Sequence, residues 1–337
     1  MRILSQFQIV MLVFCCLLIL VGYVMRPLQT FWNIRLFLTF ERHSRRPPTV
    51  STPLLHKSIN LVDLSKFEPT VDFECPLVRH EERAFNACVY TAEQDVHVSK
   101  AMLQGSYWEG SSVSKILRLL RADAGLQFVD IGANIGAYTL AVGHAGVKVL
   151  AVEPNPETLR RLRRSLTIGN ILEHVTLLHN AVSNEHVDIE LGMDVVNRGD
   201  TFLVSNISCS GLAGGRRCLQ TTVKTITIDD LLPLMTASRA VMKIDVQGSE
   251  IRVFDESTAS KFFENIDVVA ILMEWENYKV RSKYSPESCE KFLSFFYKRN
   301  LNVYDTDFKK LGKNFDNWPW DVILLKVNTS VIDDFGN

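Results

Sequence analysis

The stretch at residues 128–139, FVDIGANIGAYT, constrains the fold more than any other part of the chain. It opens with an apolar run typical of a buried parallel strand and continues through Gly132, Asn134 and Gly136 into a helix expected from residue 137. Strand, glycine-bearing turn and helix in this order open many nucleotide-binding α/β domains. Glycine suits such a turn because it tolerates positive φ and lets a ligand approach the backbone.

Two acidic residues stand where this kind of sheet binds its ligand. Asp130 lies at the carboxyl end of the first strand, and Glu153 ends a second strand expected at residues 147–152. Glu153 follows Gly132 by 21 residues, close to the spacing of roughly 20 residues for a carboxylate that binds ribose hydroxyls. The alternative is a tight turn whose glycines serve packing alone.

The spacing of the turn bears on which nucleotide is bound. It reads G-x-N-x-G-A, unlike the G-x-G-x-x-G of dinucleotide sites, and no phosphate-binding Lys-Ser or Lys-Thr pair follows. Asp130 would repel a pyrophosphate but would suit a cationic amino group. A ligand that carries an ammonium group is therefore favoured, and an NAD-dependent oxidoreductase is the weaker alternative.

Four motifs in order, VDIGANIGAYT, AVEPNPET, HNAVS and MKIDVQGSE, resemble the FkbM-type S-adenosylmethionine-dependent methyltransferases. The resemblance covers residues 95–326. It implies a doubly wound, mostly parallel Rossmann-like α/β sheet whose last strand is antiparallel, with S-adenosylmethionine as cofactor. Residues 107–109 would lie over the cofactor. The cofactor-binding residues that it implies, together with those argued above, are Asp130, Gly132, Asn134, Gly136, Glu153, Asn180 and Ala181, the last two against the adenine edge.

The motif MKIDVQGSE supplies the catalytic candidates. Asp245 ends the fourth expected strand, residues 240–246, so it should open into the crevice of Asp130; Lys243 and Glu250 flank it. Methyl transfer to a hydroxyl requires in-line placement and removal of a proton, a task for a general base. The alternative is a Lys243–Glu250 ion pair that shapes the turn. Glu274 and Glu276, after the fifth strand, are weaker candidates.

Gln247 departs from the family pattern, in which many members carry Glu. This difference leaves open a non-catalytic binding or scaffold protein that keeps the fold. If the chain is an enzyme, the resemblance points to O-methylation of a glycan or another small hydroxyl acceptor. No metal site is expected, because His174, His179 and His186 lack carboxylate or cysteine partners at ligand spacing. A metal bound through Asp245 and Glu274 stays open.

The domain organisation begins with an uncharged segment at residues 3–25, long enough to span a bilayer. We expect a tail at 1–6, a signal anchor at 7–25, a stem at 26–70, a cap at 71–120 and the methyltransferase domain at 121–330. A cleaved signal peptide is the alternative to the anchor. Within the domain, residues 183–226 break the alternation of strands and helices and predict an inserted β-hairpin or small sheet.

The compartment is contested within the sequence. The arginines at residues 26–46 favour a cytosolic side for the segment after the anchor. Sequons at Asn206 and Asn328, and the local cysteine pairs Cys75 with Cys88 and Cys209 with Cys218, favour a glycoprotein in the Golgi lumen or elsewhere in the secretory pathway. We expect the lumenal orientation. A net charge of -1 gives no reason to expect a nucleic-acid partner, and the oligomeric state is left open.

Overall fold

The computed structural model describes residues 55–66, 72–204, 212, 215–275 and 283–326. The expected tail, the anchor at 7–25 and both sequons lie outside these residues. Within the described ranges, no helix is long and apolar enough to cross a membrane. One compact unit begins at Leu54, so the last part of the expected stem belongs to the folded domain.

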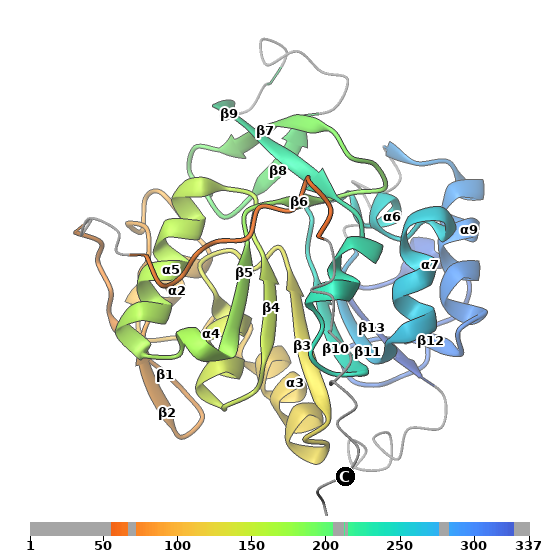
Figure 1. Cartoon of the computed structure of the whole chain (residues 1–337), viewed down its shortest axis with the longest axis horizontal. Coiled ribbons are helices and arrows are strands. Elements are labelled where there is room, and N and C mark those ends of the chain that lie inside the picture. The colour runs from red at the N-terminus through yellow and green to blue at the C-terminus, as the bar shows by residue number, and fades with distance from the viewer. Residues whose placement is uncertain (1–54, 67–71, 205–211, 213–214, 276–282, 327–337) are drawn as a thin grey trace, which may run out of the picture. The chain divides into compact units, whose positions relative to one another are not determined.

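A seven-stranded sheet forms the centre of this unit, with strand order β12-β13-β11-β10-β3-β4-β5 (Figure 1). From β11 to β5 all neighbours run parallel, and β13 runs antiparallel to both β11 and β12. The antiparallel late strand and the doubly wound order are confirmed. The strands are β3 Leu126–Ile131, β4 Val149–Val152, β5 Val175–Leu178, β10 Arg239–Ile244, β11 Asp267–Glu274, β12 Leu301–Tyr304 and β13 Asp321–Lys326.

Helices cover both faces of the sheet, which is why β3 is buried along its whole length. Alternate side chains of the strands enter two separate cores. One core is completed by α3 Gly110–Ala122, α4 Ala137–His144 and α5 Pro156–Gly169; the other by η3 Asp229–Leu234, α6 Glu250–Val253, α7 Glu256–Asn265 and α9 Pro286–Tyr297. The spacing of Leu159, Leu162 and Leu166 predicts a helix over 157–168, and α5 confirms it: Asn155 caps the helix and Asn170 ends it in the left-handed region.

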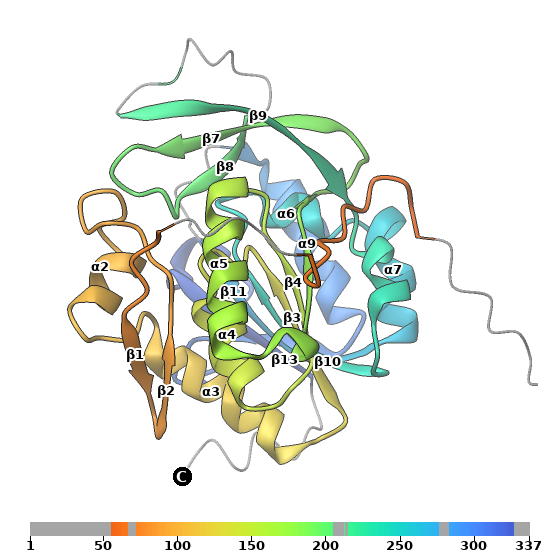
Figure 2. The ribbon, with the colours of Figure 1, turned by 60° about the vertical axis from the view of Figure 1, so that its left-hand side comes forward.

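The insertion is larger than the hairpin that the sequence predicts. It is a four-stranded sheet of order β6-β9-β7-β8, at the upper end of the central sheet in Figures 1 and 2. Its strands are β6 Ala181–Val182, β7 Asp188–Asp194, β8 Thr201–Val204 and β9 Arg216–Ile226. β7 pairs antiparallel with β8 and β9, while β6 pairs parallel with β9. The short strand β8 was not predicted, because four residues carry no clear alternation.

The first part of the described chain packs against the sheet. Residues 55–62, which we call the strap, lie alongside β5. Val62 N–H donates to the carbonyl of Leu177 at 2.9 Å. The cap contains β1 Leu77–His80, β2 Arg83–Asn86 and α2 Val98–Leu103. The sequence predicts a helical entry segment at 96–120, in which Ser111 or Ser112 would cap the helix that follows; the segment forms α2 and α3. The N-cap of α3 is Glu109, in the left-handed region, and not Ser111 or Ser112. The remaining described elements are η1 Leu172–His174 and η4 Phe315–Asn317.

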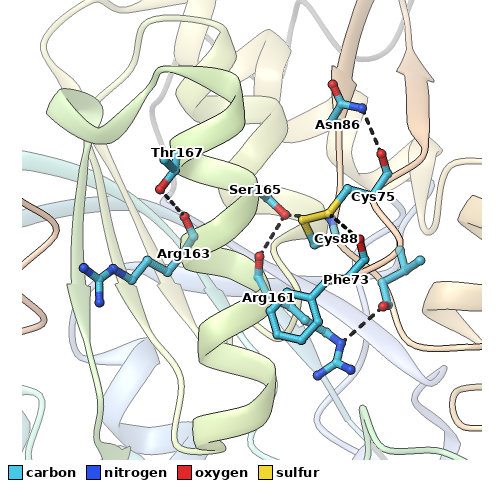
Figure 3. Close-up of a disulfide and its surroundings, with 9 residues drawn as sticks. Phe73, Cys75, Asn86, Cys88, Arg161, Arg163, Ser165 and Thr167 are labelled. Carbon is cyan, nitrogen blue, oxygen red and sulfur yellow. Dashed lines mark hydrogen bonds between the residues drawn. A yellow bond between two sulfur atoms is a disulfide. The ribbon is translucent and has the colours of Figure 1, made fainter. Parts of the chain in front are cut away.

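A disulfide between Cys75 and Cys88 closes the base of the β1–β2 hairpin (Figure 3). Cys88 N–H also donates to the hydroxyl of Ser165 on α5 at 2.7 Å. This first predicted pair is confirmed; the disulfide lies within the cap, and the Cys88–Ser165 hydrogen bond links the cap to α5. Cys218 is disulfide-bonded as well; its expected partner, Cys209, lies outside the described residues. Cys289 is free and buried.

Candidate active site

The crevice opens between the carboxyl ends of β3 and β10. β4 and β5 extend the sheet from one side of β3 and β10 extends it from the other, so the strand order reverses here. Ligands of open α/β sheets bind at such a switch point. The backbones approach closely: Gly132 has φ of 80°, and a Cβ on it would lie 1.9 Å from the carbonyl oxygen of Asp245. Only glycine fits at this position.

Glu153 stabilises the turn after β3 by accepting backbone hydrogen bonds. Its two carboxylate oxygens accept the N–H groups of Asn134 and Asn155, each at 2.8 Å. Burial raises the pKa of Glu153 to about 7, against the effect of those two hydrogen bonds. Each oxygen keeps a second lone pair for a ligand hydroxyl. Asn134 stands in the left-handed region and Gly136, with φ of 98°, begins α4.

Asp130 is 1% exposed. One of its oxygens, Oδ2, accepts the Thr139 hydroxyl at 2.6 Å, and the other is buried with no hydrogen-bond partner among the described residues. Burial raises the pKa of Asp130, and the neighbouring Lys243 partly offsets that effect. Asp130 lies beneath the crevice and not on its wall, so direct contact with a cofactor ammonium group stays a prediction.

Lys243 and Asp245 form an ion pair at the end of β10. Lys243 Nζ lies 3.0 Å from Asp245 Oδ2 and donates to the Gly132 carbonyl at 3.2 Å. Burial disfavours the charged lysine, but Asp245, Asp130 and Glu109 outweigh burial and raise its pKa above the usual range. Burial likewise opposes ionisation of Asp245, and Lys243 outweighs it and lowers the pKa of Asp245. Both groups are therefore charged at neutral pH.

Gln247 bridges two carboxylates. Its Nε2 donates to Asp245 Oδ1 at 2.8 Å and to Glu274 Oε2 at 3.3 Å. Glu274 Oε1 in turn accepts the indole N–H of Trp320 at 2.9 Å. A glutamate at position 247 would place a third negative charge beside these two carboxylates. The Gln247 amide is thus compatible with an ionised Asp245. This weakens the alternative that the chain is a non-catalytic binding or scaffold protein that keeps the fold.

Glu250 lies under the turn and not in the crevice. Its Oε1 accepts the N–H groups of Val246 and Gly248 at 3.1 and 3.2 Å, and burial raises its pKa to about 7. The partners of Lys243 described above are Asp245 and the Gly132 carbonyl, so the alternative of a Lys243–Glu250 ion pair gives way to a Lys243–Asp245 pair. Glu250 shapes the turn through backbone N–H groups. Glu276 lies outside the described residues.

Asn180 is fully buried and its amide is used within the protein. Its Nδ2 donates to the carbonyls of Ser58 and Lys224, at 2.9 and 3.0 Å, and its Oδ1 accepts the N–H of Asn60 at 2.8 Å. The side chain therefore joins the strap, β5 and β9. Asn180 and Ala181 nonetheless lie on the wall of the crevice, where they can contact a ligand without those amide atoms.

Two adjoining cavities occupy the crevice. The first is narrow, with a volume of about 40 Å³, and the second is wider, with about 420 Å³. Asn134, Gly199, Asp245 and Gln247 line both. The first cavity also has Ile131, Val152, Glu153, Ala181, Val182 and Leu203 on its wall. With Asp245 this makes an apolar slot with two carboxylates, suited to an adenine with its ribose.

The second cavity contains residues that the sequence did not assign. Glu109 accepts the hydroxyl of Tyr138 at 2.5 Å, and Lys243 Nζ lies 5.5 Å from the Tyr138 ring. Trp108 and Trp320 also line this cavity, and burial raises the pKa of nearby Asp321 to about 6, helped by Glu109. The position of residues 107–109 before a helix was a signal in the sequence for Trp108 and Glu109. The sequence held no comparable signal for Trp320 and Asp321, which lie late in the chain.

The fold and the crevice define a nucleotide-binding α/β protein with an acidic second cavity. The family model of the methyltransferase FkbM domain matches residues 130–302, which is 173 of the 337 residues. The chain therefore belongs to the FkbM methyltransferase family: it is an S-adenosylmethionine-dependent methyltransferase, and S-adenosylmethionine is its cofactor. Glu153, which lines the apolar slot, fits the ribose of that nucleoside, and the carboxylate of Asp130 beneath the crevice adds negative charge near its cationic end.

Solved structures give distant likenesses. An O-methyltransferase from Thermotoga maritima matches at 10% identity and TM-score 0.32, over 66% of this chain and 66% of that chain. An rRNA methylase from Streptococcus thermophilus matches at 12% and 0.33, over 64% and 95%. Magnesium protoporphyrin IX methyltransferase from Synechocystis, with bound S-adenosylmethionine, matches at 11% and 0.31, over 64% and 78%. Curated proteins gave no significant match.

Proposed function

We propose that this methyltransferase transfers a methyl group to a hydroxyl of a neutral, polyhydroxylated acceptor such as a glycan. The observation that carries the proposal is the ionised Asp245, which lies on the wall of both cavities beside its lysine partner. S-adenosylmethionine supplies a methyl group on a positively charged sulfur. In the proposed arrangement the nucleoside occupies the first cavity and the acceptor enters through the second.

Glu153 and the apolar wall hold the nucleoside. The ribose hydroxyls donate to the carboxylate of Glu153, whose oxygens are fixed by the N–H groups of Asn134 and Asn155. The turn at Gly132 lets the backbone approach the ligand. This preorganisation means that little rearrangement is needed on binding.

Asp245 acts on the acceptor. Its carboxylate is held by Lys243 on one oxygen and by Gln247 on the other. It would orient an acceptor hydroxyl by accepting its hydrogen bond and would take its proton as the C–O bond forms and the methyl–sulfur bond breaks, with the electron pair of that bond left on sulfur. Positioning and a general base are both large contributions to such a step, the base about 10²–10⁴-fold.

The walls of the second cavity favour a neutral acceptor. Glu109, Asp200, Asp245 and Glu274 line it, whereas Lys243 is its only Lys or Arg among the described residues and is paired with Asp245. Such a field repels phosphate, sulfate or carboxylate groups. Trp320, 54% exposed and held by Glu274, offers a flat apolar surface. Carboxylates that accept hydroxyl hydrogen bonds beside an exposed indole suit a sugar.

The substitution Asp245→Asn tests the chemical step, because it keeps the shape and removes the charge. We expect S-adenosylmethionine affinity within about fivefold of wild type and turnover lowered by about 10² or more, the scale of a lost general base. Turnover is followed by transfer of labelled methyl to a panel of neutral and sulfated oligosaccharides, with Asp188→Asn on β7 as the control.

Near-normal turnover in Asp245→Asn would show that the residue is structural. A collapse of cofactor affinity as well would place Asp245 in the cofactor site and leave the base to another residue. Transfer that prefers sulfated over neutral acceptors would contradict the acceptor class.

We propose further that the catalytic domain lies in the lumen of the secretory pathway, behind an N-terminal signal anchor. The Cys75–Cys88 disulfide supports an oxidising compartment. A non-reduced peptide map should join Cys209 to Cys218, and endoglycosidase should increase the gel mobility through loss of glycans at Asn206 or Asn328. Free thiols at both cysteines together with no glycan would contradict this location.

A further inference from the structure

Three potential metal ligands meet on the surface, outside the crevice. His56 belongs to the strap, His186 precedes β7 and Asp230 belongs to η3. His186 Nε2 lies 2.6 Å from Asp230 Oδ2, and the His56 and His186 rings stack with centroids 3.9 Å apart. One ligand atom from each of the three residues lies within 4.8 Å of the other two.

We propose that His56, His186 and Asp230 form a binding site for a divalent transition metal, with zinc as the expected ion. Two imidazoles and one carboxylate are a donor set that zinc accepts, with the fourth position left to water. Ligand atoms about 2.0–2.2 Å from a tetrahedral zinc stand roughly 3.3 Å from each other. The His186–Asp230 contact must therefore widen by less than about 1 Å, and the His56 ring must turn inward.

The surroundings of the site permit this rearrangement. The side chain of His186 is 35% exposed and that of Asp230 is 12% exposed, so an ion can enter without opening the fold. Asp230 Oδ2 also accepts the N–H and the hydroxyl of Thr227, at 2.7 and 2.9 Å. Such bonds to a ligand carboxylate fix its orientation. His56 Nδ1 accepts the N–H of Ser58 at 3.2 Å, a long contact that metal binding would exchange.

A metal here would fasten the strap to the domain. The strap crosses beside β6 in Figure 1, where it is drawn in orange. Ser58 and Asn60, directly after His56, hold the amide of Asn180, and Asn180 lies on the wall of the first cavity. The ion would therefore tie residue 56 to η3 next to the cofactor wall. The sequence could not reveal the site, because its ligands are 130 and 44 residues apart.

Metal titration of the full-length protein tests the site. The protein carries no polyhistidine tag, is freed of metal with a chelator and is titrated with zinc chloride by calorimetry. We expect one zinc per chain and a higher unfolding temperature when zinc is present. His56→Ala and His186→Ala should each weaken zinc binding at least about tenfold, since loss of a residue that merely orients a ligand already costs 10–100-fold.

His174→Ala is the matched control, a partly exposed histidine of η1 outside the cluster, and should bind zinc as wild type does. Cobalt(II) added to the wild-type protein gives a readout that needs no variant: visible absorption of a tetrahedral nitrogen- and oxygen-ligated ion is expected. Absence of zinc binding, absence of that absorption, or equal zinc affinity in wild type, His56→Ala and His186→Ala would each overturn the proposal.

Discussion

At the scale of single residues, the crevice depends on three carboxylates that the fold uses in different ways. Asp245 is paired with a lysine and ionised, Glu250 supports a turn, and Glu153 supports a turn while facing the first cavity. Asp245 and Glu153 directly follow a strand and Glu250 opens the helix after one, so their positions in the sequence could not separate these roles. The partners of each carboxylate do separate them.

Glu153→Ala tests the cofactor contact. Loss of the acceptor leaves polar ligand groups unpaired, which costs about 1–3 kcal/mol. We expect S-adenosylmethionine to bind at least roughly tenfold more weakly by calorimetry, while circular dichroism shows a folded protein. Glu173→Ala, a change at an exposed glutamate of η1, is the control and should leave affinity unchanged. Unchanged affinity in Glu153→Ala would show that the carboxylate does not contact the cofactor.

Glu250 and Glu153 also make stability depend on pH. Burial raises the pKa of each to about 7 from a usual 4.5, so the native state binds a proton more tightly than the unfolded state does. Their contribution to the free energy of unfolding is complete below pH 4.5. It is lost as pH rises through 7, by up to about 3 kcal/mol per group. Glu250→Gln should flatten the fall in unfolding free energy between pH 5 and 8, measured by urea denaturation.

The control for that measurement is Glu264→Gln, at an exposed site on α7, which should leave the slope unchanged. An unaltered slope in Glu250→Gln would mean that Glu250 is ionised in the native protein throughout this range.

At the scale of elements, the turn between β3 and α4 sets the geometry of the switch point. Gly132→Ala adds a Cβ where the Asp245 carbonyl lies, at a φ that L-residues avoid. We expect a loss of about 3 kcal/mol or more in unfolding free energy. Gly146→Ala is the matched control, because its φ is 83° but the added Cβ meets nothing within 4 Å. Only the cost of a positive φ, about 1–2 kcal/mol of unfolding free energy, therefore applies there. Equal losses in the two variants would contradict the close approach.

Elements could be predicted from the sequence where burial on both faces left a clear pattern. The strands of the parallel sheet appeared as apolar runs within two residues of their observed ends, and α5 appeared through its apolar face and its cap. β8 was missed because it is short and depends on pairing with β7. The N-cap of α3 was expected at Ser111 or Ser112 and is Glu109, because a glutamate in the left-handed region gives no sequence signal.

At the scale of the whole molecule, the order of four motifs was enough to predict the doubly wound sheet and its cofactor. Each motif follows a strand, and the carboxyl ends of parallel strands meet at one edge, so Glu153 and Asp245 had to lie together. Residues brought in by tertiary packing could not be predicted. Tyr138 and Glu109 meet across two helices, Trp320 reaches Glu274 from the last strand region, and His56 reaches His186 from the strap.

The central claim is that the crevice binds S-adenosylmethionine, and calorimetry on the full-length protein tests it most directly. Separate titrations with S-adenosylmethionine and with NAD should show one S-adenosylmethionine site per chain and no heat of binding for NAD, because Asp130 and the G-x-N-x-G turn disfavour a pyrophosphate. Binding of NAD without binding of S-adenosylmethionine would contradict the account.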